Sequence, residues 1–192
     1  MRGNVSCIEA LCVERRGGWS YAMIVLDPDA EPMAALPTMA TLRRAAQAAQ
    51  TAVRLDGEVT VLLTDDAGIR RLNRRFRGKN KATDVLSFPA AQPEFGPGFG
   101  VAGDLAISVE TAARQAAAEG HGLSTELRVL MLHGMLHLAG MDHETDAGEM
   151  AAHEAELRRK LRLPLGLIER VCAQPHERGR AIRGRAARKA KR

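Results

Sequence analysis

Three histidines lie close together in the second half of the chain: His133, His137 and His143. The segment that holds them reads His-Gly-Met-Leu-His-Leu-Ala-Gly-Met-Asp-His. If it begins as a helix, His133 and His137 share one face, about 6 Å apart along the axis. Gly140 then ends the helix, so the chain can turn back and His143 can close a triangle around one ion. Three neutral imidazoles with an open fourth position are typical of a catalytic metal site.

The same spacing occurs in the metzincin proteases, whose signature is H-E-x-x-H-x-x-G-x-x-H. The glutamate that acts as the general base in that signature is replaced here by Gly134. Glycine cannot take a proton from an attacking water, so the metal cage is present without the peptidase base. A zinc peptidase would need a glutamate from elsewhere in the chain, such as Glu110 or Glu144.

A second cluster of chemically useful residues is basic. Between positions 70 and 81 the chain has seven basic side chains and no acid: Arg70, Arg71, Arg74, Arg75, Arg77, Lys79 and Lys81. Arg70, Arg74 and Arg77 fall along one face of a predicted helix, beside an apolar stripe that ends at Phe76. The pattern fits a solvated helix face, and it also fits a phosphate-binding patch that continues into the loop after the helix.

Three segments of the chain resemble, in this order, the YbeY family of bacterial endoribonucleases and ribosomal RNA maturation factors. They are residues 73–89 (NRRFRGKNKATDVLSFP), residues 103–108 (GDLAIS) and the histidine cluster 133–143. The resemblance covers about residues 21–165. Glycine at position 134, which is puzzling in a protease, is the usual residue in this family.

The resemblance implies one zinc ion per chain, bound by His133, His137 and His143. It also implies that Arg77 is important for activity. The expected activity is cleavage of single-stranded RNA during maturation of ribosomal RNA, especially at the 3′ end of the 16S RNA, and in ribosome quality control. The expected partners are ribosomal RNA precursors and ribosome-associated proteins.

Part of this chemistry follows from the residues themselves. RNA cleavage needs a nucleophile, a group that stabilises charge at the phosphate and an acid for the leaving group. A zinc ion on three histidines can activate water and polarise a phosphoryl oxygen, and the guanidinium fork of Arg77 matches phosphate. The nucleophile can be water or the 2′-hydroxyl of the RNA. A non-catalytic alternative is a ribosome-assembly factor that keeps zinc for stability and uses its basic surface only to bind RNA.

The surrounding pattern predicts an α+β (α/β-like) single domain, with about four strands in a mixed sheet packed against about five helices. The metal site would lie on a helix and the loop that follows it. Strands are predicted over residues 21–26, 58–64, 85–88 and 103–109. Helices are predicted over 38–53, from a cap at Asp65 or Asp66 to about 76, over 110–119, from a cap at Ser124 to 139, and from a cap at Asp146 to about 161.

The charge of the chain is concentrated at its C-terminal end. The chain carries a net charge of +5, yet residues 176–192 contain eight basic residues and one acid. We therefore predict an N-terminal extension over 1–19, a hydrolase domain over 20–172 and a basic, disordered tail over 173–192. No apolar run is long enough to span a bilayer and no secretory signal is evident, which favours a soluble, cytoplasmic protein.

Overall fold

A four-stranded mixed sheet forms the centre of the fold. In the computed structural model the described residues are 22–30, 36–90, 100–143 and 145–164. The strands are β1 (Ala22–Leu26), β2 (Glu58–Thr64), β3 (Val85–Pro89) and β4 (Val101–Ser108). Their order is β1-β2-β4-β3, with β1, β2 and β4 parallel and the edge strand β3 antiparallel to β4. The predicted α+β domain with a mixed sheet is confirmed.

The burial of β2 shows that the sheet is covered on both faces. All seven of its residues are buried, and alternate side chains of a strand point to opposite faces. Val59, Val61 and Leu63 enter the main hydrophobic core, whereas Leu62 enters a second, smaller core. A strand that is buried on both sides lies between two layers, so helices lie on each face.

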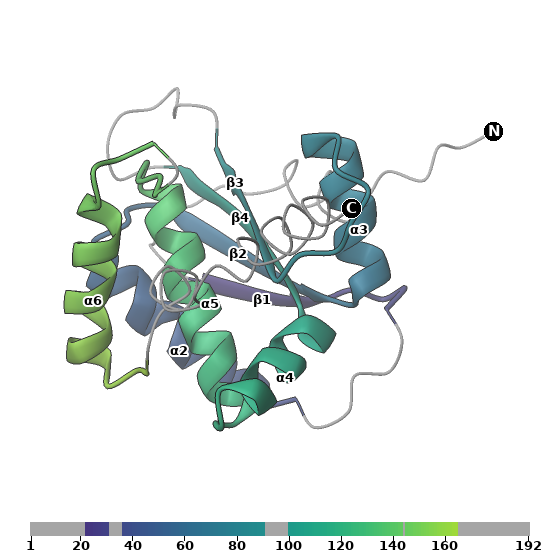
Figure 1. Ribbon diagram of the computed structural model, residues 1–192, viewed down its shortest axis with the longest axis horizontal. Helices are drawn as coiled ribbons and strands as arrows, with labels where there is room; N and C mark the ends of the chain where they lie inside the picture. Colours follow the sequence, from purple (N-terminus) through teal and green to yellow (C-terminus); the bar gives the residue numbers. More distant parts are fainter. Residues whose placement is uncertain (1–21, 31–35, 91–99, 144, 165–192) are drawn as a thin grey trace, which may run out of the picture.

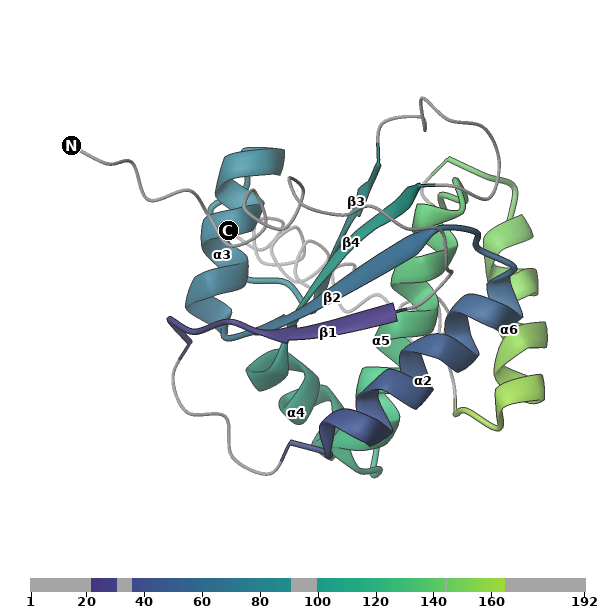
Figure 2. The same cartoon turned by 180° about the vertical axis from the view of Figure 1, so that it is seen from behind.

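The helices divide unevenly between the two faces. They are α2 (Met39–Val53), α3 (Asp66–Arg77), α4 (Val109–Ala118), α5 (Leu123–Leu138) and α6 (Glu149–Leu161). Figures 1 and 2 show α5 running along one face of the sheet with α2 and α6 beside it, while α3 stands apart on the other side. Most of α5 is buried, because it contacts the sheet as well as α2, α4 and α6. It is therefore the helix with the least freedom to shift.

The N-terminal ends of the helices show which of the predicted N-cap residues are correct. Thr38 and Asp65 accept hydrogen bonds from the backbone N–H groups of Thr41 and Gly68, as expected of N-caps. The prediction of Ser124 as the cap of α5 was wrong, because the helix already begins at Leu123 and Gly122 is its N-cap. The backbone carbonyl of Gly122 accepts the first helical hydrogen bonds, so no side-chain cap is used there.

The cap of α6 is displaced from its predicted residue. Gly148, whose φ is +102°, is the N-cap in the structure. The carboxylate of Asp146 still accepts hydrogen bonds from the backbone N–H groups of Gly148 and Met150, at 2.8 and 2.7 Å. Asp146, the predicted cap, therefore still accepts hydrogen bonds from N–H groups at the start of the helix, although it lies two residues before the N-cap. It reaches them because Gly148, in the left-handed conformation, turns the chain back toward it.

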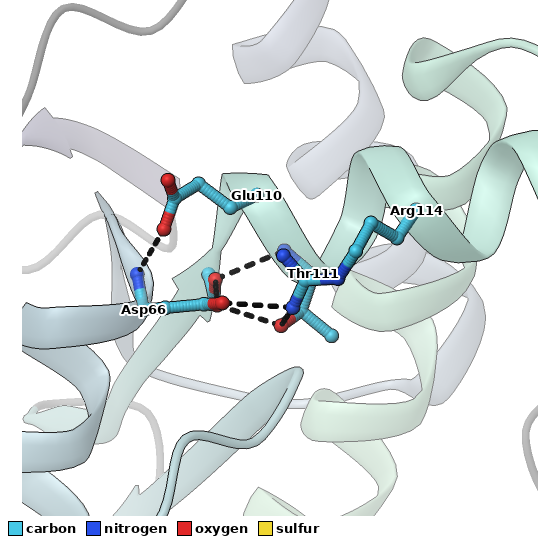
Figure 3. A network of polar contacts seen from close by, with 5 residues as sticks. Asp66, Glu110, Thr111 and Arg114 are labelled. Atoms are coloured by element: carbon cyan, nitrogen blue, oxygen red, sulfur yellow. Dashed lines mark hydrogen bonds and ion pairs between the residues drawn. The ribbon is translucent and has the colours of Figure 1, made fainter.

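A polar network joins the N-terminal end of α3 to that of α4 (Figure 3). The carboxylate of Asp66 accepts hydrogen bonds from Ser108 (2.5 Å), Thr111 (2.7 Å) and Arg114 (2.7 Å). The carboxylate of Glu110 accepts from the backbone N–H of Asp66 at 2.8 Å. Burial alone would raise the pKa of Asp66, but these hydrogen bonds and the charge of Arg114 lower it overall. The network fixes the direction in which α3 leaves the sheet.

The ends of the predicted domain organisation fall outside the described residues. The extension 1–19, residues 165–172 of the predicted domain and the tail 173–192 are not described, so those boundaries stay predictions. Among the helices of the described part, we find none with the length and apolar character that a bilayer crossing requires.

Gly103 allows β4, β3 and the end of α5 to approach one another. Its φ is +147°, and an added Cβ would lie 2.5 Å from the carbonyl oxygen of Phe88 and 2.8 Å from Leu138. We expect Gly103→Ala to lower the free energy of unfolding by about 3 kcal/mol or more, because backbone strain and overpacking add. Gly120→Ala is the control, since Gly120 has a φ of +71° and open space around it. The measurement is urea unfolding. An equal decrease in the free energy of unfolding for Gly103→Ala and Gly120→Ala would contradict the steric argument.

Candidate metal centre

The three histidines meet at the C-terminal end of α5. His133 and His137 lie one turn apart, with their Nε2 atoms 3.2 Å from each other. The chain then turns at Gly140, whose φ is +87°, and brings His143 back. One ligand atom from each ring lies within 4.8 Å of those of the other two, and the ring centroids are 4.8 to 5.3 Å apart. The predicted triangle is therefore present.

The surroundings of the triangle favour the neutral form of the His137 ring. Burial lowers the pKa of His137 below its ordinary value, and the neighbouring His133 and His143 lower it further. His133 is itself buried, with 4% of its surface exposed. A neutral ring carries the lone pair that binds a metal, so the lowered pKa keeps His137 in the form that can act as a ligand at neutral pH. Three such nitrogens at this spacing fit one metal ion.

Packing explains why position 134 is glycine. An added Cβ would lie 2.8 Å from the Cδ2 atom of Leu105 and 3.3 Å from the hydroxyl of Ser87. Leu105 is completely buried in the core, and the Ser87 hydroxyl donates to the carbonyl of Gly134 at 3.2 Å. A glutamate at this position would clash with the sheet. The metzincin-type base is therefore excluded by the way α5 lies on β3 and β4.

Neither of the other glutamates considered as a peptidase base is shown to serve the site. The Glu110 carboxylate binds the backbone N–H of Asp66 and does not line the pocket that contains the histidines. Glu144 lies outside the described residues. Asp142 does line the pocket, and its backbone carbonyl accepts from the N–H groups of Thr145 and Asp146 in the turn that follows.

Arg77 lies on the wall of the same pocket. The pocket has a volume of about 400 Å³ and is lined by the three histidines and by Arg77, Asp84 and Ser87, among others. Arg77 is the last residue of α3 and is exposed. Arg77 belongs to α3 on one face of the sheet, whereas His133 and His137 belong to α5 on the other face. The edge strand β3 therefore lies between Arg77 and the histidines. The structure thus brings together the residues that the sequence singled out from segments more than fifty positions apart.

A carboxylate that the sequence did not single out also reaches the site. The Oε1 atom of Glu154, on α6, lies 3.4 Å from Nδ1 of His133, and Glu154 is 1% exposed. The sequence does indicate that Glu154 is buried, because Met150, Glu154 and Leu157 follow the spacing of a buried helix face. A glutamate in the middle of such a face is rarely buried without a charged or polar partner.

Comparison with known proteins places the chain in a family. Residues 32–162 match the family described as Endoribonuclease YbeY, and this range contains every residue of the pocket. The chain belongs to the YbeY family. The resemblance seen in the sequence is therefore confirmed, and the chain is a member of a family of nucleases, which are hydrolases.

YbeY relatives match over most of their own length. Endoribonuclease YbeY of Koribacter versatilis is 56% identical over 123 residues, which are 64% of this chain and 77% of that protein. The protein of the same name from Solibacter usitatus is 54% identical, covering 69% of this chain and 88% of the relative. The protein of that name from Nitrobacter winogradskyi is 38% identical over 84% of this chain and 94% of its own length.

We expect the purified protein to hold one metal ion per chain that depends on the histidine triangle. His137→Ala removes one of three ligands, so it should weaken metal affinity by more than the roughly 10- to 100-fold typical of losing a residue that only hydrogen-bonds a ligand. His153→Ala, a histidine on α6 outside the triangle, is the control. The measurement is metal content by elemental analysis after dialysis against a chelator. Equal metal content in wild type and in His137→Ala would contradict the assignment.

Proposed function

We propose that this protein is a zinc-dependent endoribonuclease that cleaves single-stranded RNA. Its proposed substrate is ribosomal RNA precursor, with a role at the 3′ end of the 16S RNA and in ribosome quality control. Ribosome-associated proteins are the proposed partners, and the cytoplasm is the proposed location. One observation carries the proposal: the histidine triangle and Arg77 line the same pocket.

Zinc is the metal that this set of donors suits best. Three imidazole nitrogens with an open fourth position are typical of catalytic zinc sites, whereas magnesium and calcium take oxygen ligands. When bound, the ion supplies a Lewis acid at the reacting phosphate. The protein's own part is to hold three imidazoles in one place, which the end of α5 and the turn at Gly140 do.

Arg77 is suited to hold the phosphate that is attacked. It ends α3, and Gly78 follows with a φ of +68°, so the backbone turns away and leaves the guanidinium beside the pocket. A guanidinium presents a planar fork of donors to two phosphate oxygens and stays charged throughout. Arg70, Arg74 and Arg75 precede it as exposed residues of the same helix, and this surface can attract the RNA backbone.

We expect Arg77 to matter for cleavage much more than for folding. Its side chain is exposed, so Arg77→Ala leaves no core cavity. If the guanidinium stabilises charge that grows on the phosphate, its loss should slow cleavage by roughly a hundred- to a thousandfold. Arg77→Lys should restore part of the rate, since lysine keeps the charge without the fork. The measurement is single-turnover cleavage of a single-stranded RNA by zinc-loaded protein, with melting temperature as the check on folding.

Arg74→Ala is the matched control for Arg77, because Arg74 is also exposed on α3 but does not line the pocket. It should retain most of the wild-type cleavage rate. Cleavage by Arg77→Ala at the wild-type rate would show that the phosphate role is wrong. RNA binding without any cleavage by the wild-type protein would favour the assembly-factor alternative, and digestion of casein instead of RNA would favour the peptidase.

An exposed aromatic ring supports a preference for single strands. Phe76, directly before Arg77, is 46% exposed although it ends the apolar stripe of α3. Its ring packs edge-on against Phe88 at 5.1 Å between centroids, and the guanidinium of Arg75 lies 5.3 Å from its centre. A rigid aromatic ring among arginines is the usual platform for a nucleobase, which can stack only when it is not paired in a duplex.

We expect Phe76→Ala to weaken binding of single-stranded RNA by about 1–3 kcal/mol, the cost typical of losing one base–aromatic stack. Phe76→Trp should bind as well as wild type. Binding to a duplex of the same sequence should change little. The measurement is fluorescence anisotropy in a His137→Ala background, which is expected not to cleave. An equal loss for duplex and single strand would mean that Phe76 supports the local fold and does not stack on a base.

A further inference from the structure

Glu154 is a buried carboxylate with a single ionic neighbour in the described part of the chain. It lies on α6 with 1% of its surface exposed, and its Oε1 atom is 3.4 Å from Nδ1 of His133. Within the described residues, neither carboxylate oxygen forms a hydrogen bond, and neither does Nδ1 of His133. Burying a carboxylate in this way is unfavourable unless a positive charge or a donor compensates it.

The orientation of the His133 ring shows what the carboxylate can do. Its Nε2 atom faces Nε2 of His137 at 3.2 Å, in the centre of the triangle. Its Nδ1 atom is the one that faces Glu154. A neutral imidazole carries its proton on only one nitrogen, so a proton on Nδ1 leaves the lone pair of Nε2 for a metal.

We propose that Glu154 is a positioning residue that accepts the Nδ1 proton of His133 in a hydrogen bond and so directs Nε2 at the metal. This inference rests on the metal site of the proposed function. The atoms need to approach by only a few tenths of an ångström to reach ordinary hydrogen-bond distance. A bound divalent cation also offsets the negative charge of the carboxylate, which accounts for a glutamate in an apolar interface.

The packing of α6 holds the carboxylate in place. Met150 and Leu157, one turn before and one turn after Glu154, are buried in the same core as α5. The start of the helix is fixed by the hydrogen bonds from Gly148 and Met150 to Asp146. The start of α6 is therefore anchored, and α6 serves to support the metal site as well as to cover the core.

Zinc affinity separates this role from a purely structural one. Glu154→Leu keeps the volume and removes the acceptor, so we expect zinc affinity to fall about 10- to 100-fold. The metal-free variant should melt no lower than wild type, because a buried charge is removed. Glu154→Gln keeps an acceptor oxygen and should lie between the two. Glu156→Gln is the matched control, since Glu156 is an exposed residue of α6 paired with Lys160.

The measurement is competition for Zn²⁺ against a chelator of known affinity, with thermal unfolding of the metal-free proteins. If Glu154→Leu binds zinc as tightly as wild type, the positioning role is wrong while the histidine site and the proposed function stand. If wild-type protein binds no zinc, the inference falls together with the zinc part of the proposed function.

The wild-type protein offers a second test that needs no variant. In the zinc-loaded protein, nitrogen NMR of the His133 ring should show a proton on Nδ1 and a metal bond at Nε2. A metal bond at Nδ1, or a proton on neither nitrogen, would overturn the inference even if every substitution at Glu154 failed to fold.

Discussion

The close contact of α5 with the sheet is the constraint on which the site depends. At Gly134 the helix lies so near to Leu105 that even a Cβ would need the core to move. The two histidines on either side of this contact, His133 and His137, therefore stand beside β3 and not above the sheet. A side chain at position 134 would require Leu105 or the helix to move. The glycine thus leaves no room for a glutamate base of the metzincin kind and lets α5 lie close to the sheet.

The same contact concentrates polar groups in an apolar environment. His133 and Glu154 are almost completely buried within the packing of α5 and α6. In such a low-dielectric setting each group is costly alone, and the cost falls when donor, acceptor and cation come together. Arg77 stays exposed on the far side of β3. The pocket therefore has a more buried side, with the histidines, and an exposed side, with Arg77.

The sequence was sufficient for features that depend on neighbouring residues. The i, i+4 spacing of His133 and His137 and the helix end at Gly140 predict the triangle, because a helix and one turn fix all three positions. The pattern of residues 58–64 likewise predicts a strand, but not that it is buried on both faces. Whether Arg77 lies near the histidines depends on how α3 and α5 pack on opposite faces, and local pattern does not encode that. The family resemblance implied only that Arg77 is important for activity, and the structure places it in the pocket of the histidines.

Glu154 was missed for the same physical reason. Its partner is on another helix, and only the packing of α6 against α5 brings the two together. The cap of α5 was misplaced because Gly122 can start a helix through its backbone alone, so the nearby Ser124 was a misleading signal. Errors of one or two residues at helix ends do not alter which face a helix buries, and the site is unaffected by them.

We propose that three imidazole nitrogens, and no other side chains, hold one zinc ion. X-ray absorption at the zinc edge of the purified protein tests it most directly. The account predicts three nitrogen scatterers from imidazole rings at about 2.0–2.1 Å and the remaining coordination by oxygen from solvent. A sulfur scatterer at about 2.3 Å, or a spectrum with no imidazole contribution, would contradict it.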